Sequence, residues 1–400
     1  MRRPFGGTRH PRVWTAVLGV GVLLLGAGTT GALALRHLDG NIRSVDVSAG
    51  LGTDRPAPEP AEDGGRPINI LVVGTDTRAG DNGFIGGSEK GEGRSDTTLV
   101  LHVAADRESA LGVSIPRDSM VRMPDCRSLG GGEVAGATRQ FNAAYTIGGV
   151  ACTQRTVEQL TGVRIDHYVV VDFAGFRNIV DALGSVEICL PHAVDDPRSK
   201  LDLPAGRQRV NGTQALAYVR TRHGLGDGGD LGRVARQQAF ISAVLQEATS
   251  AGTLTNPKKL YDVLDTATRS ITVDPDLASL TRLASLARMV NGIGLDRISF
   301  VTVPTAEYPW DHNRLEWSSQ ASQLWRAVRK DRPLVTTPSA SPSASPSSSP
   351  SSSASSSASA TPSATPSPGA TGSSGKAPVH LDGVTERRAD TDVCSGDSDG

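Results

Sequence analysis

The sequence predicts an α/β protein: a layered α/β/α domain with a mixed central sheet, preceded by one transmembrane helix and followed by a disordered Ser/Pro tail. Short apolar runs alternate with segments of helical periodicity between residues 67 and 333. Several of these runs end in Asp or Arg. In α/β sheets, ligands bind at the ends of the strands, so charged residues there are candidates for a binding site. Hydrophobic residues make up 38% of the chain even though a Ser/Pro segment dilutes them, so a sizeable core is possible.

The formal net charge of the 400-residue chain is −1. This balance argues against a nucleic-acid partner bound through bulk electrostatics, and any anion site must be local. Four cysteines without a C-x-x-C pair indicate neither a zinc site nor a thioredoxin-like motif.

The N-terminus has the pattern of a membrane anchor. Residues 1–12 carry four arginines and no acid, and residues 13–35 are uncharged and long enough to span a bilayer. This order predicts a cytoplasmic segment over 1–12, a span over 13–35 and an exported body. The sequence Ala-Leu-Ala over residues 32–34 resembles a cleavage site, so a removed signal peptide is the alternative. The polar residues 36–66 are interpreted as an extracellular linker.

Three predicted strands near the start of the domain are bordered by charged residues. The ranges are 68–74, 97–103 and 110–115, and the bordering residues are Asp76, Arg94, Asp96 and Arg117. One such Asp alone would be a turn or cap residue, but carboxylates interleaved with arginines favour a metal-bridged phosphate site. The Gly-rich insertion over 81–93 lacks the residue order of a P-loop.

The stretch from Thr213 to Gln238 gathers most of the chemistry. We expect residues 215–219 to form a buried strand that continues into Arg220 and Arg222, which alternation would place on one face.

A Gly- and Asp-rich loop follows, and Asp230 is predicted to cap a helix that begins at Leu231. Helical spacing then puts Arg233, Arg236 and Gln237 on a shared face. Guanidinium groups suit paired phosphate oxygens. Because the chain has 35 arginines against six lysines, a solvated, salt-bridged surface is the alternative.

Further elements follow from local signals. Strands are expected at 165–171, 186–190 and 298–303. Helices are expected at 140–149, at 151–160, after Asp172 up to Gly184, after Asn256-Pro257, after Asp274-Pro275 and at 315–330. The helix after Pro275 carries an apolar stripe that we assign to the core, namely Leu277, Leu280, Leu283, Ala284 and Ala287.

The C-terminal part is predicted to lie outside the domain. Residues 334–375 form a disordered Ser/Pro/Ala/Thr linker and 376–400 a polar tail, so deletion of 334–400 should leave the domain folded. Export favours a disulfide between Cys126 and Cys152. Pairing of Cys189 with Cys394 is less favoured, since Cys394 would have to return across the linker.

Seven segments in order, NILVVGTDTR, RSDTTLVLHV, SIPRDSMV, FNAAYTIGG, TVEQLTGVRIDHYVVVDFAGF, ALAYVRTRHG and DLGRVARQQAF, resemble the motif series of the LytR-CpsA-Psr family. The resemblance implies a membrane-anchored, outward-facing phosphotransferase. Such an enzyme moves a glycopolymer from a polyprenyl-pyrophosphate carrier to the muramic acid 6-hydroxyl of peptidoglycan.

Carried over by position, the resemblance makes Asp76 and Asp96 the ligands of Mg²⁺, with Mn²⁺ as the alternative ion. The catalytic set would be Asp96, Arg117, Arg220 and Arg222, and the substrate-binding set would add Arg94, Arg233, Arg236 and Gln237. Two rival functions remain: hydrolysis of polyprenyl pyrophosphate, and non-catalytic binding of anionic glycan or lipid. The sequence does not identify the donor polymer.

Overall fold

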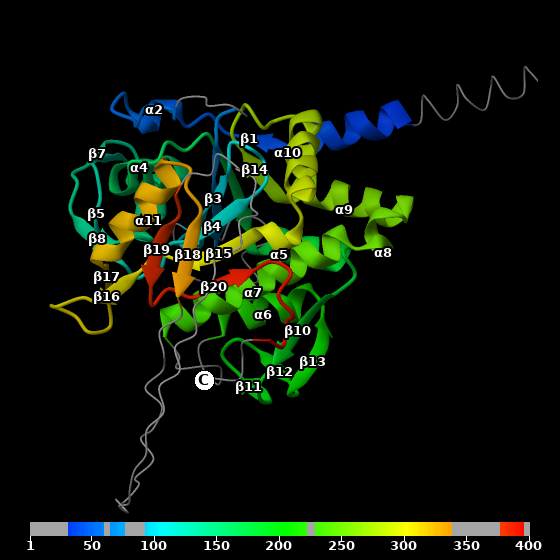
Figure 1. Ribbon diagram of the computed structural model, residues 1–400. Coiled ribbons are helices and arrows are strands. Elements are labelled where there is room, and N and C mark those ends of the chain that lie inside the picture. Colours follow the sequence, from blue (N-terminus) through cyan, green and yellow to red (C-terminus); the bar gives the residue numbers. More distant parts are fainter. Residues whose placement is uncertain (1–30, 60–64, 77–92, 222–228, 338–376, 396–400) are drawn as a thin grey trace, which may run out of the picture.

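A mixed sheet forms the centre of the computed structural model, which describes residues 31–59, 65–76, 93–221, 229–337 and 377–395 (Figure 1). Within these ranges the sheet order is β1-β14-β9-β2-β3-β4-β15-β20. The bounds are β1 Arg43–Ser44, β14 Ile271–Val273, β9 His167–Asp172, β2 Ile68–Thr75, β3 Ser95–Val103, β4 Ala110–Ser114, β15 Ile298–Thr302 and β20 Glu386–Arg388. The β2–β9, β4–β15 and β1–β14 pairs are parallel and the other pairs are antiparallel, which confirms the mixed sheet.

Helices cover both faces of the sheet. On one face lie α4 (Ala143–Thr161) and α11 (Ser319–Arg329). On the other lie α5 (Phe173–Ala182), α6 (Gly212–Arg220), α7 (Asp230–Thr249), α9 (Pro257–Ser270) and α10 (Leu280–Ile293) (Figure 1). The predicted α/β/α layering is confirmed.

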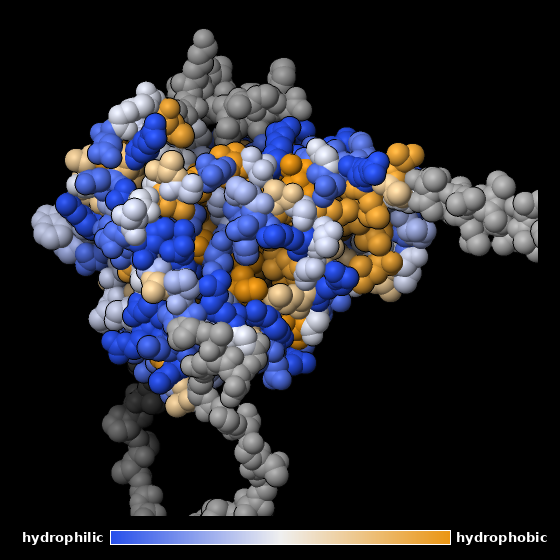
Figure 2. Space-filling view, turned by 90° about the horizontal axis from the view of Figure 1, so that it is seen from above, coloured by the Kyte–Doolittle hydropathy of each residue, from blue (hydrophilic) through white to orange (hydrophobic). Residues whose placement is uncertain are grey.

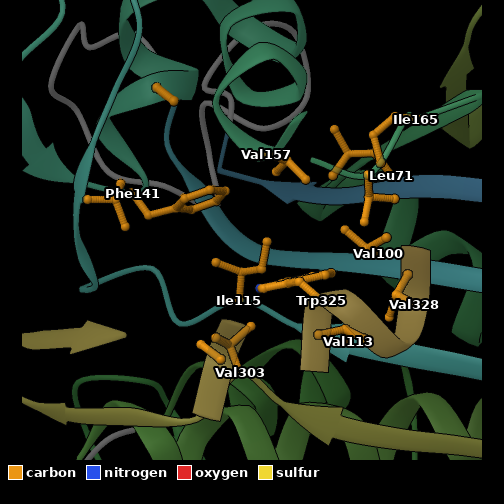
Figure 3. Packing of buried hydrophobic residues seen from close by; sticks show 14 of the residues in the cluster. Leu71, Val100, Val113, Ile115, Phe141, Val157, Ile165, Val303, Trp325 and Val328 are labelled. Carbon is orange, nitrogen blue, oxygen red and sulfur yellow. The ribbon is translucent and has the colours of Figure 1, made fainter. Parts of the chain in front are cut away.

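Alternation along the strands divides the core. Leu71, Val100 and Val113 point to the α4 and α11 side, where they pack around Trp325 (Figure 3). Their neighbours Val72 and Leu99 point to the other face and pack against α7 and α10.

Short elements complete the domain. They are α2 (Ser48–Leu51), α8 (Ala251–Leu254), the 3-10 helix η2 (Leu295–Arg297), and the hairpins and pairs β5 (Met120–Arg122) with β8 (Thr138–Gln140), β6 (Cys126–Arg127) with β7 (Glu133–Val134), β10 (Val186–Leu190) with β13 (Gly206–Val210), β11 (Val194–Asp196) with β12 (Leu201–Leu203), β16 (Thr305–Glu307) with β17 (Leu315–Trp317), and β18 (Leu334–Thr337) with β19 (Val379–Asp382).

The predicted strand over 215–219 is wrong: this segment lies inside helix α6. Asn211 and Gln214 form a reciprocal capping box, in which each side chain accepts a hydrogen bond from the other residue's backbone N–H. The helix runs to Arg220, so the expected placement of Arg220 and Arg222 side by side on a strand does not hold. Arg222 lies outside the described residues.

Three helix predictions also need correction. The segments 140–149 and 151–160 form one helix, α4, interrupted at Gly148 and Gly149, where the φ of Gly149 is 60°. Asp274 caps a turn, and α10 begins only at Leu280 behind the cap Ser279. The expected closing helix starts at Ser319, after strand β17.

The stripe assigned to the core is largely a half-buried face. Leu277 is buried, but it precedes α10; Leu280, Leu283 and Ala284 are partly buried and Ala287 is exposed.

The C-terminal segment is part of the domain, contrary to the prediction. Strand β20 adds to the main sheet beside β15, and Leu381, Val384 and Ala389 are buried. Cys189 and Cys394 form a disulfide, as do Cys126 and Cys152. The Cys126–Cys152 disulfide confirms the favoured prediction. The Cys189–Cys394 disulfide also forms, so the lower rank given to that pairing is wrong.

Residues before the predicted domain also pack onto it. Leu38 and Leu51 are buried, and Arg55 forms an ion pair with Glu158. The helix over 31–41 contacts α9, where the Asn41 amide donates to Asp265 Oδ1 at 2.9 Å. In the part of the chain described, no helix is both long and apolar enough to cross a membrane. Most of the predicted span over 13–35 lies outside that part.

Candidate active site

Asp96 occupies a bulge at the start of β3. Gly74 of β2 pairs with Thr97 and Thr75 pairs with Ser95, so Asp96 is the extra residue of β3. Bulges re-aim side chains and are frequent beside active sites. The Asp96 carboxylate forms an ion pair with the guanidinium of Arg117, which follows β4.

Asp76 lies on the same edge of the sheet. It follows β2, and its carboxylate accepts a hydrogen bond from the backbone N–H of Arg94. In return the Asp76 N–H donates to the Arg94 carbonyl at 3.1 Å. The structure therefore brings Asp76, Arg94, Asp96 and Arg117 together, as the sequence predicted.

Arg117 is the centre of a charge network. In addition to the ion pair of Arg117 with Asp96, the Arg117 Nε lies 3.6 Å from Asp118 Oδ2 and 3.5 Å from Asp230 Oδ1. This side chain is largely buried between β4 and the start of α7. Charge-assisted contacts of this kind fix the direction of a guanidinium group.

Asp230 and Arg233 form a buried ion pair on the first turn of α7. The side chain of Arg233 is 4% exposed and that of Asp230 9% exposed. Burial raises the pKa of the Asp230 carboxyl, and burial lowers the pKa of the Arg233 guanidinium, because each charged form loses hydration. The cap of α7 is Gly229, so the predicted cap role of Asp230 is wrong by one residue.

Arg220 approaches the network from the C-terminal end of α6. Its guanidinium carbon lies 4.7 Å from the centroid of the Phe173 ring, a cation–π contact. On α7, Gln237 is buried, while Arg236 donates through Nη2 to the Thr221 carbonyl at 2.6 Å. Arg236 therefore positions the chain that leaves α6.

Gln238 fixes α7 to the sheet. Its side-chain amide donates to Ser114 Oγ at 2.9 Å and to Thr302 Oγ1 at 3.1 Å, at the ends of β4 and β15. The helix that carries Arg233 and Gln237 is thus held at the same edge as Arg117.

Two cavities meet at Arg117. The first, of about 170 Å³, is lined by Asp96, Thr97, Arg117, Phe173, Val219, Arg220, Arg233 and Gln237. The second, of about 230 Å³, is lined by Arg94, Arg117, Asp118, Gln140, Asn142 and Arg314. The first combines three arginines with the apolar side chains Phe173 and Val219, which suits a ligand with an anionic group and an apolar neighbour.

Several residues that line the two cavities are not among the site residues predicted from the sequence. Asp118 directly follows Arg117, and Phe173 directly follows the predicted cap Asp172, so adjacency to a recognised residue was a usable signal. Asn142 lies in the recognised segment FNAAYTIGG, although no role was predicted for it, whereas Arg314 gave no local signal because only the tertiary fold brings it to the cavity.

Among the described residues, no group of three or more His, Cys, Asp or Glu side chains is placed to hold a metal ion. Asp76 and Asp96 could supply two carboxylates. Magnesium is often held by one or two carboxylates and by substrate phosphates and waters, so these residues fit a metal that binds together with its substrate.

The sequence profile of the LytR_cpsA_psr family matches residues 37–330. This range includes all the site residues named above. The chain belongs to the LytR_cpsA_psr family.

Two relatives within the LytR_cpsA_psr family come from Corynebacterium glutamicum. The cell wall biosynthesis protein LcpA is 33% identical over 323 residues, covering 74% of this chain and 60% of LcpA. The probable cell wall biosynthesis protein LcpB is 39% identical over 297 residues, covering 73% of this chain and 64% of LcpB. The matched region thus spans less than two thirds of each relative's length.

A third relative is TagV of Bacillus subtilis, named a polyisoprenyl-teichoic acid–peptidoglycan teichoic acid transferase. It is 28% identical over 272 residues, covering 66% of this chain and 63% of TagV. The crystal structure of TagV superimposes with a TM-score of 0.51 at 27% identity, covering 66% of this chain and 94% of that one. The architecture of the sheet and its helices is therefore that of the family.

Proposed function

We propose that this chain transfers a glycopolymer from a polyprenyl-pyrophosphate carrier to the muramic acid 6-hydroxyl of peptidoglycan, in cell-wall assembly. The observation that carries the proposal is the placement of Arg117 between two cavities, with Arg220 and Arg233 beside it and Asp96 bound to it. The names of the relatives, which refer to cell wall biosynthesis and teichoic acid transfer, support it.

The pyrophosphate would lie in the smaller cavity. Arg117, Arg220 and Arg233 converge there, and Gln237 adds an amide. Arginine forks bind phosphate oxygens in pairs, and the neighbouring Phe173 and Val219 offer apolar contact to the first part of a polyprenyl chain. Arg94 would contact the same group from the larger cavity. Arg222 keeps its proposed role from the family resemblance alone.

Mg²⁺, or alternatively Mn²⁺, would be held by Asp76 and Asp96 together with the phosphates. When bound, the ion would neutralise charge on the phosphate oxygens. The bulge at Asp96 and the backbone contact at Asp76 direct both carboxylates to one edge of the sheet.

The reaction is a displacement at the phosphorus that carries the sugar. The acceptor hydroxyl oxygen forms a bond to this phosphorus, and the bond from the phosphorus to the bridging oxygen breaks. Polyprenyl phosphate leaves, and the hydroxyl proton is released. Arginines at the site stabilise the charge that develops on the leaving and equatorial oxygens.

The protein would be anchored by residues 13–35, with a cytoplasmic N-terminus and the catalytic domain outside. Exposed apolar residues near the start of the described chain support this placement: Leu33 and Leu35 on the helix over 31–41, and Tyr261 and Leu264 on the adjacent α9. Figure 2 shows apolar surface gathered on one side of the face seen from above. Sequencing of the mature N-terminus tests the anchor, and a start near Arg36 would contradict it.

Release of polyprenyl phosphate separates the proposal from its rivals. Purified protein is incubated with a polyprenyl-pyrophosphate-linked glycopolymer, with and without peptidoglycan. We expect release of polyprenyl phosphate that depends on peptidoglycan. Equal release without peptidoglycan would indicate a hydrolase, and binding without any release would indicate a non-catalytic protein.

A further inference from the structure

The larger cavity has the chemistry of a carbohydrate site. All six lining side chains are polar: Arg94, Arg117, Asp118, Gln140, Asn142 and Arg314. A polyprenyl chain would find no apolar contact there. Amides and carboxylates beside guanidinium groups offer both acceptors and donors, and sugar hydroxyls, unlike phosphate oxygens, use both.

Asn142 supplies an unused hydrogen-bonding group in this cavity. The residue is 7% exposed, yet its side-chain amide makes no hydrogen bond to another described residue and does not cap α4. Because Asn142 lines the cavity and its amide is not used by the protein, this amide can donate to and accept from a ligand there.

The neighbouring carboxylate of Asp118 is held in place. It accepts a hydrogen bond from the Gln140 amide at 2.9 Å and lies 3.4 Å from Arg314 Nη1. Its position relative to Asn142 is therefore fixed before any ligand binds, which lowers the cost of ordering the site.

The β16–β17 hairpin extends from the wall of this cavity. Leu315 bridges to Ser119, and Trp317 stacks on the buried Trp325 with ring centroids 5.9 Å apart. The hairpin's turn is ordered: the Tyr308 N–H donates to the Arg314 carbonyl at 3.0 Å. Arg314 thus belongs both to the turn and to the cavity wall.

Trp310 is 80% exposed on this ordered turn, with its ring 5.2 Å from that of Tyr308. Large aromatic side chains are normally well buried, so an exposed tryptophan beside the half-buried Tyr308 on an ordered turn indicates a contact surface. In Figure 1 the hairpin lies at the end of the molecule away from the helix over 31–41. A polymer can reach it from the side opposite the N-terminal helix.

We propose that the larger cavity and the Tyr308–Trp310 turn form a glycan subsite, an inference that rests on the proposed function. At about 230 Å³ the cavity is smaller than the ~300–1,000 Å³ of pockets that enclose drug-sized ligands, so it takes a single sugar ring. The next rings of the chain lie on the turn, with their apolar faces on Trp310. Because the cavity shares Arg117 with the pyrophosphate site, the bound ring lies beside the reacting phosphate.

The test is calorimetric titration of the full chain and its Trp310→Ala and Asn142→Ala variants with three probes. The first probe is lipid-free glycan strands of peptidoglycan, the second a short isoprenyl pyrophosphate, and the third the same pyrophosphate carrying a disaccharide. Tyr261→Ala, which removes an exposed aromatic ring from α9, is the matched control.

We expect Trp310→Ala to weaken binding of a glycan-bearing probe by about tenfold, which corresponds to the loss of a stacking contact. Binding of the plain isoprenyl pyrophosphate should stay within about twofold of the parent value. Weaker binding of peptidoglycan strands would assign the subsite to the acceptor, and weaker binding of the disaccharide-bearing probe would assign it to the donor.

Unchanged binding of both glycan probes by both variants would overturn the subsite. Failure of the proposed function would look different, since the parent protein would then not bind the plain isoprenyl pyrophosphate.

Discussion

The guanidinium of Arg220, at the end of α6, lies over the ring of Phe173, the first residue of α5, at 4.7 Å from the ring centroid. Both side chains line the smaller cavity. The contact joins two helices that are separated in sequence by strands β10 to β13. It holds an exposed arginine in one direction, toward the site assigned to pyrophosphate.

Substitution of Arg220 should lower the rate of glycopolymer transfer more than substitution of Phe173. Arg220→Ala removes a charged contact worth ~1.5–3 kcal/mol, so we expect a loss of at least about tenfold in kcat/KM. Phe173→Leu keeps apolar volume and loses only the cation–π contact, worth ~0.5–1 kcal/mol, so the loss should be about two- to fivefold. Arg209→Ala, which removes an exposed arginine paired with Glu247, is the control. Equal activity of Arg220→Ala and the control would show that Arg220 is only a solvated residue.

The buried pair of Asp230 and Arg233 should be important for stability. Asp230→Asn leaves the Arg233 charge buried with a weaker partner, and breaking such a pair costs ~3–5 kcal/mol. Urea unfolding followed by circular dichroism measures the loss. The exposed pair of Lys258 and Asp262 provides the control, since Asp262→Asn should cost at most ~0.5 kcal/mol.

A second variant separates charge from packing. If the loss comes from the unpaired charge, adding Arg233→Met to Asp230→Asn should recover part of the stability. A double variant that is no more stable than Asp230→Asn would refute this explanation.

The pair of His167 and Asp274 predicts a pH dependence of stability. The hydrogen bond to Asp274 raises the pKa of His167 above its ordinary value of 6.5. A raised pKa in the folded state gives stability that is fully present below pH 6.5 and is lost as the pH rises through the folded-state pKa. The unfolding free energy of the parent protein should therefore fall above pH 6.5, and that of His167→Asn should fall less. Parallel pH profiles would contradict the assignment.

Deletion of residues 377–400 should destabilise the domain. The deletion removes β20 from the edge of the sheet, takes Leu381 and Ala389 out of the core, and breaks the Cys189–Cys394 disulfide. Loss of a native disulfide alone typically costs ~2–5 kcal/mol. Cys394→Ser isolates that contribution in denaturant titrations, and the truncated chain should unfold at a still lower denaturant concentration. Identical midpoints for the truncated and full chains would show that the segment is dispensable.

The central strands could be predicted because their apolar runs are unambiguous. Residues 68–74 and 97–103 were placed within two residues of β2 and β3. The bulge at Asp96 could not be predicted, since a shift of one residue in register leaves no trace in composition.

The errors have physical reasons. The segment 215–219 is too short and too uniformly apolar for its hydrophobic periodicity to distinguish a strand from a helix. The capping pair Asn211 and Gln214 was a usable signal for a helix. Strand β20, with the sequence Glu-Arg-Arg, has no apolar pattern. Its place in the sheet depends on pairing with β15 and on the disulfide at Cys394.

The charged site residues were largely recognised because their chemistry is visible in the sequence. Asp76, Arg94, Asp96 and Arg117 border strands that the sequence identified, and adjacent strands bring them to one edge. Residues of the larger cavity such as Arg314 come from distant segments, and only the tertiary structure reveals their proximity.

The most direct test of the proposed transfer is mass spectrometry of the covalent product. The full chain is incubated with the lipid-linked glycopolymer, peptidoglycan and Mg²⁺, and the peptidoglycan is then digested with a muramidase. We expect fragments that carry the polymer on the muramic acid 6-hydroxyl through a phosphodiester, and we expect these fragments to be lost with Asp96→Asn at every Mg²⁺ concentration. Release of free polymer without the phosphodiester, or full product formation by Asp96→Asn, would contradict it.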